Sequence, residues 1–425
     1  MGIRKPHDGA GCVYCKRFIN AMPATLKNYL IVTAGYWAFT VTDGAIRMLV
    51  VLYFHLLGYS PFEVAMLFLF YEFFGIVTNL VGGWLGSRIG LNMTMHIGMG
   101  LQVFALILLM VPEAWLSVAY VMFAQALSGI AKDLNKMSAK ASVKTLLPQN
   151  EDTESKLFKW IAILTGSKNA LKGFGFFLGA LLLQWFEFRG ALAILSSSLF
   201  IVLIASIIML PTGLGKSKNK TKFTQVFSKT PAINWLSAAR FFLFGSRDVW
   251  FVVALPVYLY SVFEWDFMQV GGFLALWIIG YGVVQASAPK LLLYSHHNHG
   301  PDGSTAKLWV FILAVIPAAI AAGLYFKFEP QFVLVAGLIA FGFVFAINSA
   351  VHSYLIIAWS EHDKVSMNVG FYYMANAGGR LTGTVLSGWL YQTQGLIGCL
   401  IWSSLFIVTA GILSMRLPVT RMSET

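Results

Sequence analysis

The chain has 425 residues, of which 58% are hydrophobic and only 11% are charged. A soluble domain carries roughly 25% charged residues, so this composition excludes an ordinary soluble globular protein. The formal net charge of +12 would suit nucleic acid or an anionic surface. However, the apolar blocks of about 20 to 28 residues are long enough to cross a hydrocarbon layer of ~30 Å. We therefore expect a multi-pass protein of the lipid bilayer with no nucleic-acid partner.

Hydropathy and helix breakers predict six spanning helices in the first half of the chain, near 29–57, 62–86, 93–112, 115–137, 157–185 and 190–210. Six more follow near 232–260, 268–292, 307–326, 331–358, 366–391 and 396–416. We thus expect an all-α membrane protein of twelve transmembrane helices in two six-helix halves. Its expected parts are an N-terminal arm (1–28), an N-terminal bundle (29–210), a basic linker (211–231), a C-terminal bundle (232–416) and a tail (417–425).

The two halves carry a weak internal repeat. A shift of about 205 residues superposes residues of the first half on identical residues of the second. The matched pairs are Asp43 with Asp248, Tyr53 with Tyr258, and Gly75 with Gly280. Two parallel six-helix halves joined by a long linker are the architecture of major facilitator transporters, so we expect that fold.

A loop after the second predicted helix resembles the same class. The run GGWLGSRIGLN matches the major facilitator loop pattern at Gly83, Arg88 and Gly90, whereas Ser87 stands where that family has an aspartate. The alternative is a glycine-rich turn with a snorkelling arginine.

Charge is distributed unevenly between alternate loops. Lysine and arginine crowd the N-terminal arm, the central linker and the tail, while the opposite loops are mainly acidic. The positive-inside rule then predicts that both termini are cytoplasmic. We expect the membrane to be a bacterial inner membrane.

Eight ionisable residues fall near the middle of predicted helices, where each costs at least ~2.5–3.5 kcal/mol. The cations are Arg47, Lys168, Lys172, Arg247 and Arg380, and the acids are Asp43, Glu72 and Asp248. Lys168 and Lys172 share a helix face and repel, so they need a counter-anion. Because cations outnumber acids, we expect the five cations to bind an oxyanion in a central cavity, with Asn376 and Tyr373 completing its lining.

Salt bridges are the alternative for any one of these residues: Asp43 with Arg47, Asp248 with Arg247 or Lys172, and Glu72 with Arg380. They leave the surplus cations unexplained. We assign the three acids to coupling or gating. Glu72, which has no cation next to it in the sequence, is the best candidate for a proton carrier.

The run KDLNKMSAK places Lys132, Lys136 and Lys140 in one stripe, with Asp133 beside it. This stripe is either a lipid-facing, snorkelling helix end or a cytoplasmic vestibule that attracts an anion. We expect no metal site, because the Cys12 and Cys15 pair and the run from His296 to His299 lack partners. Nor do we expect a cofactor or enzymatic activity, since the chain shows no nucleophile with a positioned partner and no nucleotide-binding loop.

Several runs resemble the ArsJ-type organoarsenical efflux permeases, a major facilitator branch. They are TDGAIRMLVVLYFHLLGYSP, FYEFFGIVTNLVGGWL, AQALSGIAKDLNKMSAKA, LTGSKNALKGFGFFLG and YYMANAGGRLTGTVLSGWLYQ, and the likeness covers about residues 28 to 416.

The resemblance implies export of 1-arseno-3-phosphoglycerate, which a glyceraldehyde-3-phosphate dehydrogenase makes from arsenate, and hence arsenate resistance. Proton antiport by a monomer is the expected mode of action. The alternative is an organophosphate/phosphate exchanger or another proton-coupled organic-anion transporter of the same fold.

Overall fold

The computed structural model describes residues 24–59, 67–146, 153–211, 230–265, 267–295, 300–361 and 364–419. The predictions for the two N-terminal cysteines, for the histidine run 296–299 and for the basic linker beyond residue 211 lie outside the described residues.

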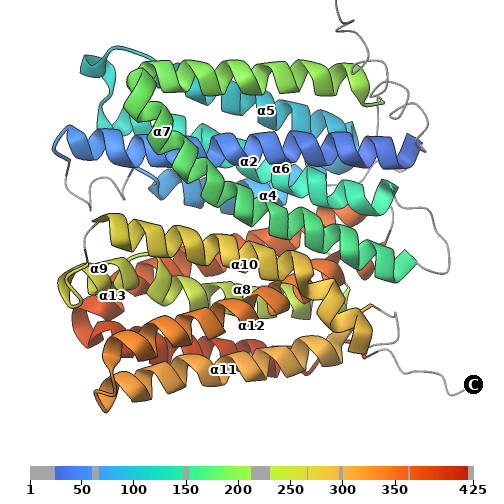
Figure 1. Cartoon of the computed structure of the whole chain (residues 1–425). Coiled ribbons are helices and arrows are strands. Elements are labelled where there is room, and N and C mark those ends of the chain that lie inside the picture. The colour runs from blue at the N-terminus through green and yellow to red at the C-terminus, as the bar shows by residue number, and fades with distance from the viewer. Residues whose placement is uncertain are drawn as a thin grey trace, which may run out of the picture.

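The N-terminal half consists of long helices that run side by side (Figure 1). They are α2 (Ala24–Leu56), α4 (Leu69–Ile89), α5 (Leu91–Leu108), α6 (Val118–Leu146) and α7 (Thr153–Met209), with the short 3-10 helix η1 (Glu113–Trp115) before α6. Within α7 the chain reverses at Glu187, whose φ of 57° is not helical, so this element contains two passes.

The C-terminal half repeats this arrangement. Its helices are α8 (Pro231–Phe251), α9 (Ala254–Ser261), α10 (Phe267–Ser295), α11 (Gly303–Tyr325), α12 (Pro330–Ala358) and α13 (Val365–Ser414). The chain turns within α13 at Gly395, where φ is 68°. The predicted helix 232–260 is interrupted between α8 and α9, because Pro256 has no N–H to donate to the carbonyl of residue 252. Counting α8 with α9 as one pass, the described helices make twelve passes, which confirms the predicted fold class.

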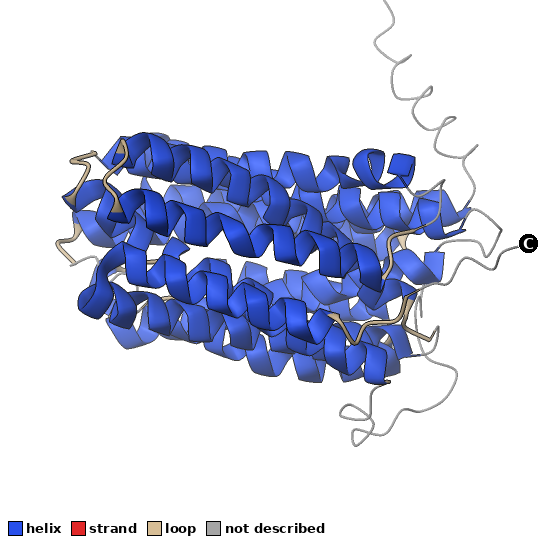
Figure 2. Cartoon of the chain, turned by 90° about the horizontal axis from the view of Figure 1, so that it is seen from below, coloured by secondary structure: helices blue, strands red, loops and turns tan. Residues whose placement is uncertain are grey.

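The two halves lie side by side with their helices roughly parallel, and the loops gather at the two ends (Figure 2). The first and the last described residues of the chain lie at one end, at the right of Figure 1. We call this end the terminus end and the other the far end. Helix α6 extends to Leu146 rather than ending near 137 as predicted, so Lys132 lies at its middle.

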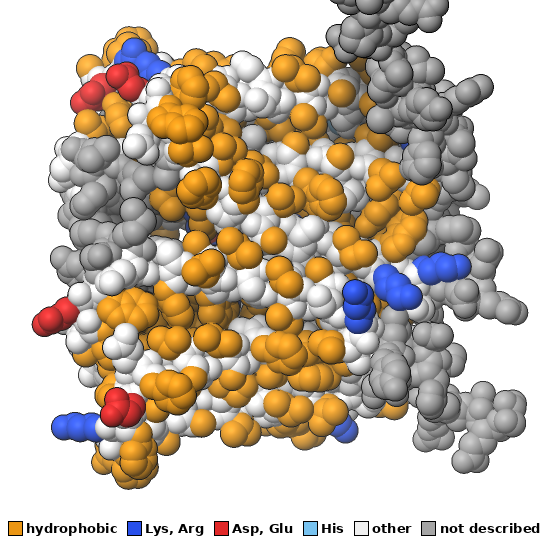
Figure 3. Space-filling view, in the orientation of Figure 1, with side chains coloured by type: hydrophobic (Ala, Val, Ile, Leu, Met, Phe, Trp, Pro, Cys, Tyr) orange, Lys and Arg blue, Asp and Glu red, His pale blue; other side chains and the backbone are white. Residues whose placement is uncertain are grey.

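The surface fits a lipid environment. Six stretches of the described helices are long and apolar enough to cross a membrane, and large side chains such as Ile208 (77% exposed) point outward. On one face, hydrophobic side chains cover the middle, acidic side chains lie only at the far end, and Lys and Arg lie at both ends (Figure 3). Such extensive exposed apolar area is unfavourable in water, so the helices require a bilayer.

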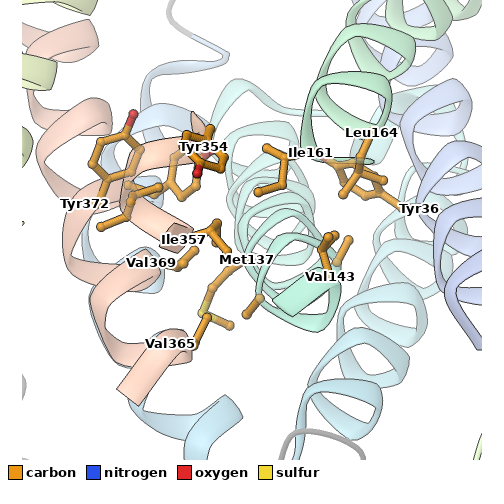
Figure 4. Packing of buried hydrophobic residues seen from close by; sticks show 14 of the residues in the cluster. Tyr36, Met137, Val143, Ile161, Leu164, Tyr354, Ile357, Val365, Val369 and Tyr372 are labelled. Carbon is orange, nitrogen blue, oxygen red and sulfur yellow. The ribbon is translucent and has the colours of Figure 1, made fainter. Parts of the chain in front are cut away.

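Three buried hydrophobic clusters show how the halves join. The cluster at the terminus end draws on both halves and includes Phe158, whose ring centroid lies 5.2 Å from that of Tyr354. Met137, Val143 and Ile161 of the first half face Ile357, Val365 and Val369 of the second (Figure 4). The other two clusters each draw on one half alone. The described residues therefore form one shared core at the terminus end and separate cores elsewhere.

Glycines allow a close approach between the halves, at α7 and α10. A Cβ on Gly282 would lie 2.6 Å from the Gly166 carbonyl oxygen and 2.7 Å from the Ala170 nitrogen. No larger residue fits there without moving the backbone, so this contact fixes the spacing of the two halves.

Candidate functional site

Charged side chains meet where the halves face each other, at the middle of the helices. The central cluster contains nine cations and four carboxylates. The cations are Arg47, Lys132, Lys136, Lys140, Lys168, Lys172, Arg240, Arg247 and Arg380, and the acids are Asp43, Glu72, Asp133 and Asp248. They come from α2, α4, α6, α7, α8 and α13. The first-half helices α2, α4 and α6 are not among the six stretches of the described residues that are long and apolar enough to cross a membrane.

Glu72 on α4 is the hub of an ionic bridge between the halves. Its carboxylate accepts hydrogen bonds from Arg380 (2.9 Å) and Arg47 (3.3 Å), and the Lys132 ammonium lies 3.8 Å away. The sequence shows no cation beside Glu72, whereas the fold brings three to it. The Glu72–Arg380 contact joins the two halves, because Arg380 lies on α13.

Arg380 extends this bridge into the second half. Its Nε donates to Asp248 at 3.0 Å, and Asp248 also accepts from Arg247 at 2.6 Å. The Asp248 side chain is fully buried, while 28% of the Arg380 side chain is exposed. Two of the pairings that the sequence suggested, Glu72 with Arg380 and Asp248 with Arg247, are present.

The suggested pairing of Asp43 with Arg47 is not among the described ion pairs. Asp43 accepts a hydrogen bond from the Tyr71 hydroxyl at 2.5 Å and lies 3.6 Å from the Lys172 ammonium. Arg47 turns instead to Glu72 and stacks over Tyr71, with its guanidinium 4.6 Å from the ring centroid. Helical spacing permitted the Asp43–Arg47 pair, but side chains from neighbouring helices provide better partners for both.

The basic stripe of α6 points into the protein. Lys136 contacts Asp133, and Lys132 lies 3.7 Å from that carboxylate and 3.8 Å from the Tyr71 ring centroid. Lys140 donates to the Tyr373 hydroxyl across the boundary between the halves. These side chains line the interior and not the lipid, so the snorkelling interpretation is wrong. They join the central cluster itself, because α6 is longer than predicted.

The carboxylates do not reach every cation. Among the described residues, Lys140, Lys168 and Arg240 make no ion pair, whereas the other six cations of the central cluster each lie within 4 Å of a carboxylate oxygen. In the central cluster, three cations thus have no carboxylate partner among the described residues. Asn376 and Tyr373, which were expected to line the site, contact Arg240 and Lys140.

Sequence reasoning missed Arg240. This residue is 2% exposed and donates from Nε to Asn376 Oδ1 at 2.9 Å. A depth argument would have found it, because it follows the start of α8 by nine residues, about 14 Å along the axis.

The side chains of the central cluster differ in their exposure. Arg47 and Glu72 are 26% and 21% exposed, while Lys140, nearer the terminus end, is buried. Together with the shared core at the terminus end, these exposures indicate that the two halves are closed against each other at that end.

A separate groove of about 330 Å³ lies between the start of α2 and the end of α7. Its lining is apolar except for Lys27 and Ser206, and the central cluster does not contribute to it.

In the described part of the chain, no three His, Cys, Asp or Glu side chains are placed to hold a metal ion.

Comparison with known proteins bears on the fold and the family of the chain. No curated protein matches the chain. The fold is similar to that of the human organic anion transporter MFSD10 (TETRAN), with a TM-score of 0.73 at 15% sequence identity over 92% of this chain and 100% of that one. An outward-facing bacterial homologue of the iron transporter ferroportin matches with a TM-score of 0.73 at 14% identity, over 91% and 98% of the chains. The E. coli fucose:proton symporter FucP matches with a TM-score of 0.69 at 13% identity, over 92% and 99%.

At these identities the structures share the fold alone. The sequence itself matches the model of the Major Facilitator Superfamily over residues 31–296, which is more than half of the chain. The chain therefore belongs to the Major Facilitator Superfamily and is a multi-pass membrane transporter.

Proposed function

We propose that this transporter is a secondary active exporter of an anionic organoarsenical, 1-arseno-3-phosphoglycerate, and that it confers resistance to arsenate. The observation that carries the proposal is the excess of cations over carboxylates, nine against four, in the central cluster. The resemblance of the charged runs to ArsJ-type permeases supports the identity of the anion.

The charge of the cluster suits this substrate. Buried cations are costly unless they are paired, and an anionic ligand supplies the missing charge when it binds. Arginine offers a planar fork for bidentate contact with phosphate or carboxylate, and lysine offers a point charge. A neutral or cationic substrate would leave the surplus uncompensated.

The proposed orientation has both termini in the cytoplasm of a bacterial inner membrane. The state described above is then closed on the cytoplasmic side, and substrate leaves from the far end. A membrane potential that is negative inside favours this direction, by ~2.3 kcal/mol for each net negative charge per 100 mV. Proton antiport, with Glu72 or an Asp as the coupling group, completes the proposal. A partner glyceraldehyde-3-phosphate dehydrogenase supplies the substrate.

Uptake into everted membrane vesicles tests the function. We expect arsenic to accumulate only when arsenate, glyceraldehyde 3-phosphate, NAD and the dehydrogenase are all present, because only then is the ester formed. Vesicles without the transporter are the control. Uptake of phosphate or glycerol phosphate alone would instead identify an organophosphate/phosphate exchanger.

A further inference from the structure

The three cations without a carboxylate lie in one region of the central cluster. Lys140 on α6 contacts Ser353 of α12, and Arg240 on α8 contacts Ser349, one turn earlier on the same helix. Asn169, the neighbour of Lys168 on α7, donates to Gln285, which donates to the same Ser349 hydroxyl. The other cations of the cluster contact acids, so their charge is already compensated in this state. These three therefore carry the uncompensated positive charge of the cluster.

Arg240 has an incomplete set of partners. Besides Asn376, it contacts the Ser349 hydroxyl at 3.4 Å, and its guanidinium lies 3.7 Å from the Phe244 ring centroid. Its Nη1 is buried and has no hydrogen-bond partner among the described residues. An amide, a hydroxyl and a ring are weak compensation for a buried charge, so fold stability alone does not explain Arg240.

Lys140 and Lys168 are similarly placed. Lys140 is 2% exposed, and its described polar contacts are the hydroxyls of Tyr373 and of Ser353, the latter at 3.5 Å. Lys168 is partly exposed and has no described hydrogen bond or ion pair. His352 on α12, the chain neighbour of the Ser353 that Lys140 contacts, is fully buried, and neither ring nitrogen has a described partner. Four helices thus bring to one region nitrogen atoms that have no acidic partner among the described residues.

We propose that Arg240, Lys140 and Lys168 form the binding site for the phosphoryl group of the transported anion, with His352 as a further donor. The inference rests on the proposed function and assigns its site. A guanidinium fork flanked by two ammonium groups matches a tetrahedral oxyanion that carries about two negative charges. Arg47, Arg247 and Arg380, which contact acids, act instead in the ionic bridge between the halves.

This assignment links binding to the change of state. Lys140 belongs to the first half, whereas Arg240, Tyr373 and Ser353 belong to the second, so their contacts form as the terminus end closes. The anion enters when that end is open. Closure transfers Lys140 to the two hydroxyls and weakens the hold on the anion, which then leaves past the partly exposed Lys168.

Binding of radiolabelled 3-phosphoglycerate to the full chain in lipid nanodiscs tests the site. We expect Arg240→Gln, Lys140→Gln and Lys168→Gln each to weaken binding by about tenfold to a hundredfold, as expected for a lost hydrogen bond to a charged group. Lys159→Gln removes an exposed lysine from the same helix as Lys168 and should stay within about twofold of wild type. Arg240→Lys, which keeps the charge but not the fork, should bind better than Arg240→Gln.

Competition identifies the recognised group. Glycerol 3-phosphate should displace the label, whereas glycerate, which lacks the phosphoryl group, should not. The reverse order would overturn the phosphoryl assignment. If wild type binds no label, or if all three Gln variants bind as wild type does, the site is wrong.

Two controls distinguish a wrong site assignment from misfolding of a variant and from a wrong proposed function. Size-exclusion profiles report folding, and Lys168→Gln alters a partly exposed side chain, so it decides the matter if the buried variants misfold. Variants that still export the arsenate ester at the wild-type rate refute the site but not the proposed function. If the wild-type protein exports no arsenical but the Gln variants still lose 3-phosphoglycerate binding, the proposed function is refuted and the site is not.

Discussion

The Glu72–Arg380 contact should couple the two halves energetically, and a double-mutant cycle measures that coupling. The variants are Glu72→Gln, Arg380→Gln and the double variant that carries both substitutions. A hydrogen-bonded contact between charged groups contributes about 1.5–3 kcal/mol. The side chains are 21% and 28% exposed, so solvent screens them, and Glu72 keeps Arg47 as a second partner. We therefore expect a coupling free energy of about 1–2 kcal/mol.

The assay is reversible unfolding in mixed micelles, which gives the free energy of unfolding of each variant. The matched control is the Glu361–Lys364 pair, with a 2.7 Å contact but 58% and 46% exposed side chains. Its cycle should give no more than about 0.5 kcal/mol. If the Glu72 and Arg380 changes add to within about 0.5 kcal/mol, the proposed ionic bridge does not contribute to the stability of this state.

Two further predictions concern packing and closure. A Cβ at Gly379 on α13 would collide with the Phe241 backbone of α8, so Gly379→Ala should lower the melting temperature by several degrees. A Cβ at Gly388 on the same helix meets no atom within 4 Å, so Gly388→Ala should leave the melting temperature unchanged. Equal melting temperatures would contradict this packing. A Cβ at Gly86 would lie 2.6 Å from the Ser366 hydroxyl at the terminus end. The double variant Gly86→Cys with Ser366→Cys, in a background without other cysteines, should therefore form a disulfide on oxidation. We expect this crosslink to stop transport and its reduction to restore transport. Transport unchanged by complete crosslinking would show that this end need not open.

Hydropathy was sufficient to predict the helices, because the bilayer imposes both their length and their apolar surface. The predicted helix 331–358 differs from α12 (Pro330–Ala358) by a single residue. Larger errors occur where charge interrupts the apolar pattern. Helix α6 extends nine residues beyond its predicted end, through Lys140, because that lysine is buried and donates to the Tyr373 hydroxyl instead of facing water at a helix end.

The composition of the site was more predictable than its connections. The position of Arg47, Lys168 and Arg380 near the middle of predicted spanning helices showed that these charges need partners. It could not show which helices face one another. Local spacing favoured a bond between Asp43 and Arg47, while the fold brings Lys172 to Asp43. Pairing between distant segments depends on the packing of whole helices, which a single sequence does not reveal.

Arsenic uptake into everted vesicles by matched lysine variants tests the central claim, that uncompensated cations carry the anion. With the ester formed in place, wild type and Lys159→Gln should accumulate arsenic at similar rates. Lys168→Gln, present in the membrane at the same level, should accumulate at most about a tenth as much, since it lacks an unpaired charge at the site. Equal accumulation by Lys168→Gln and wild type would contradict the account.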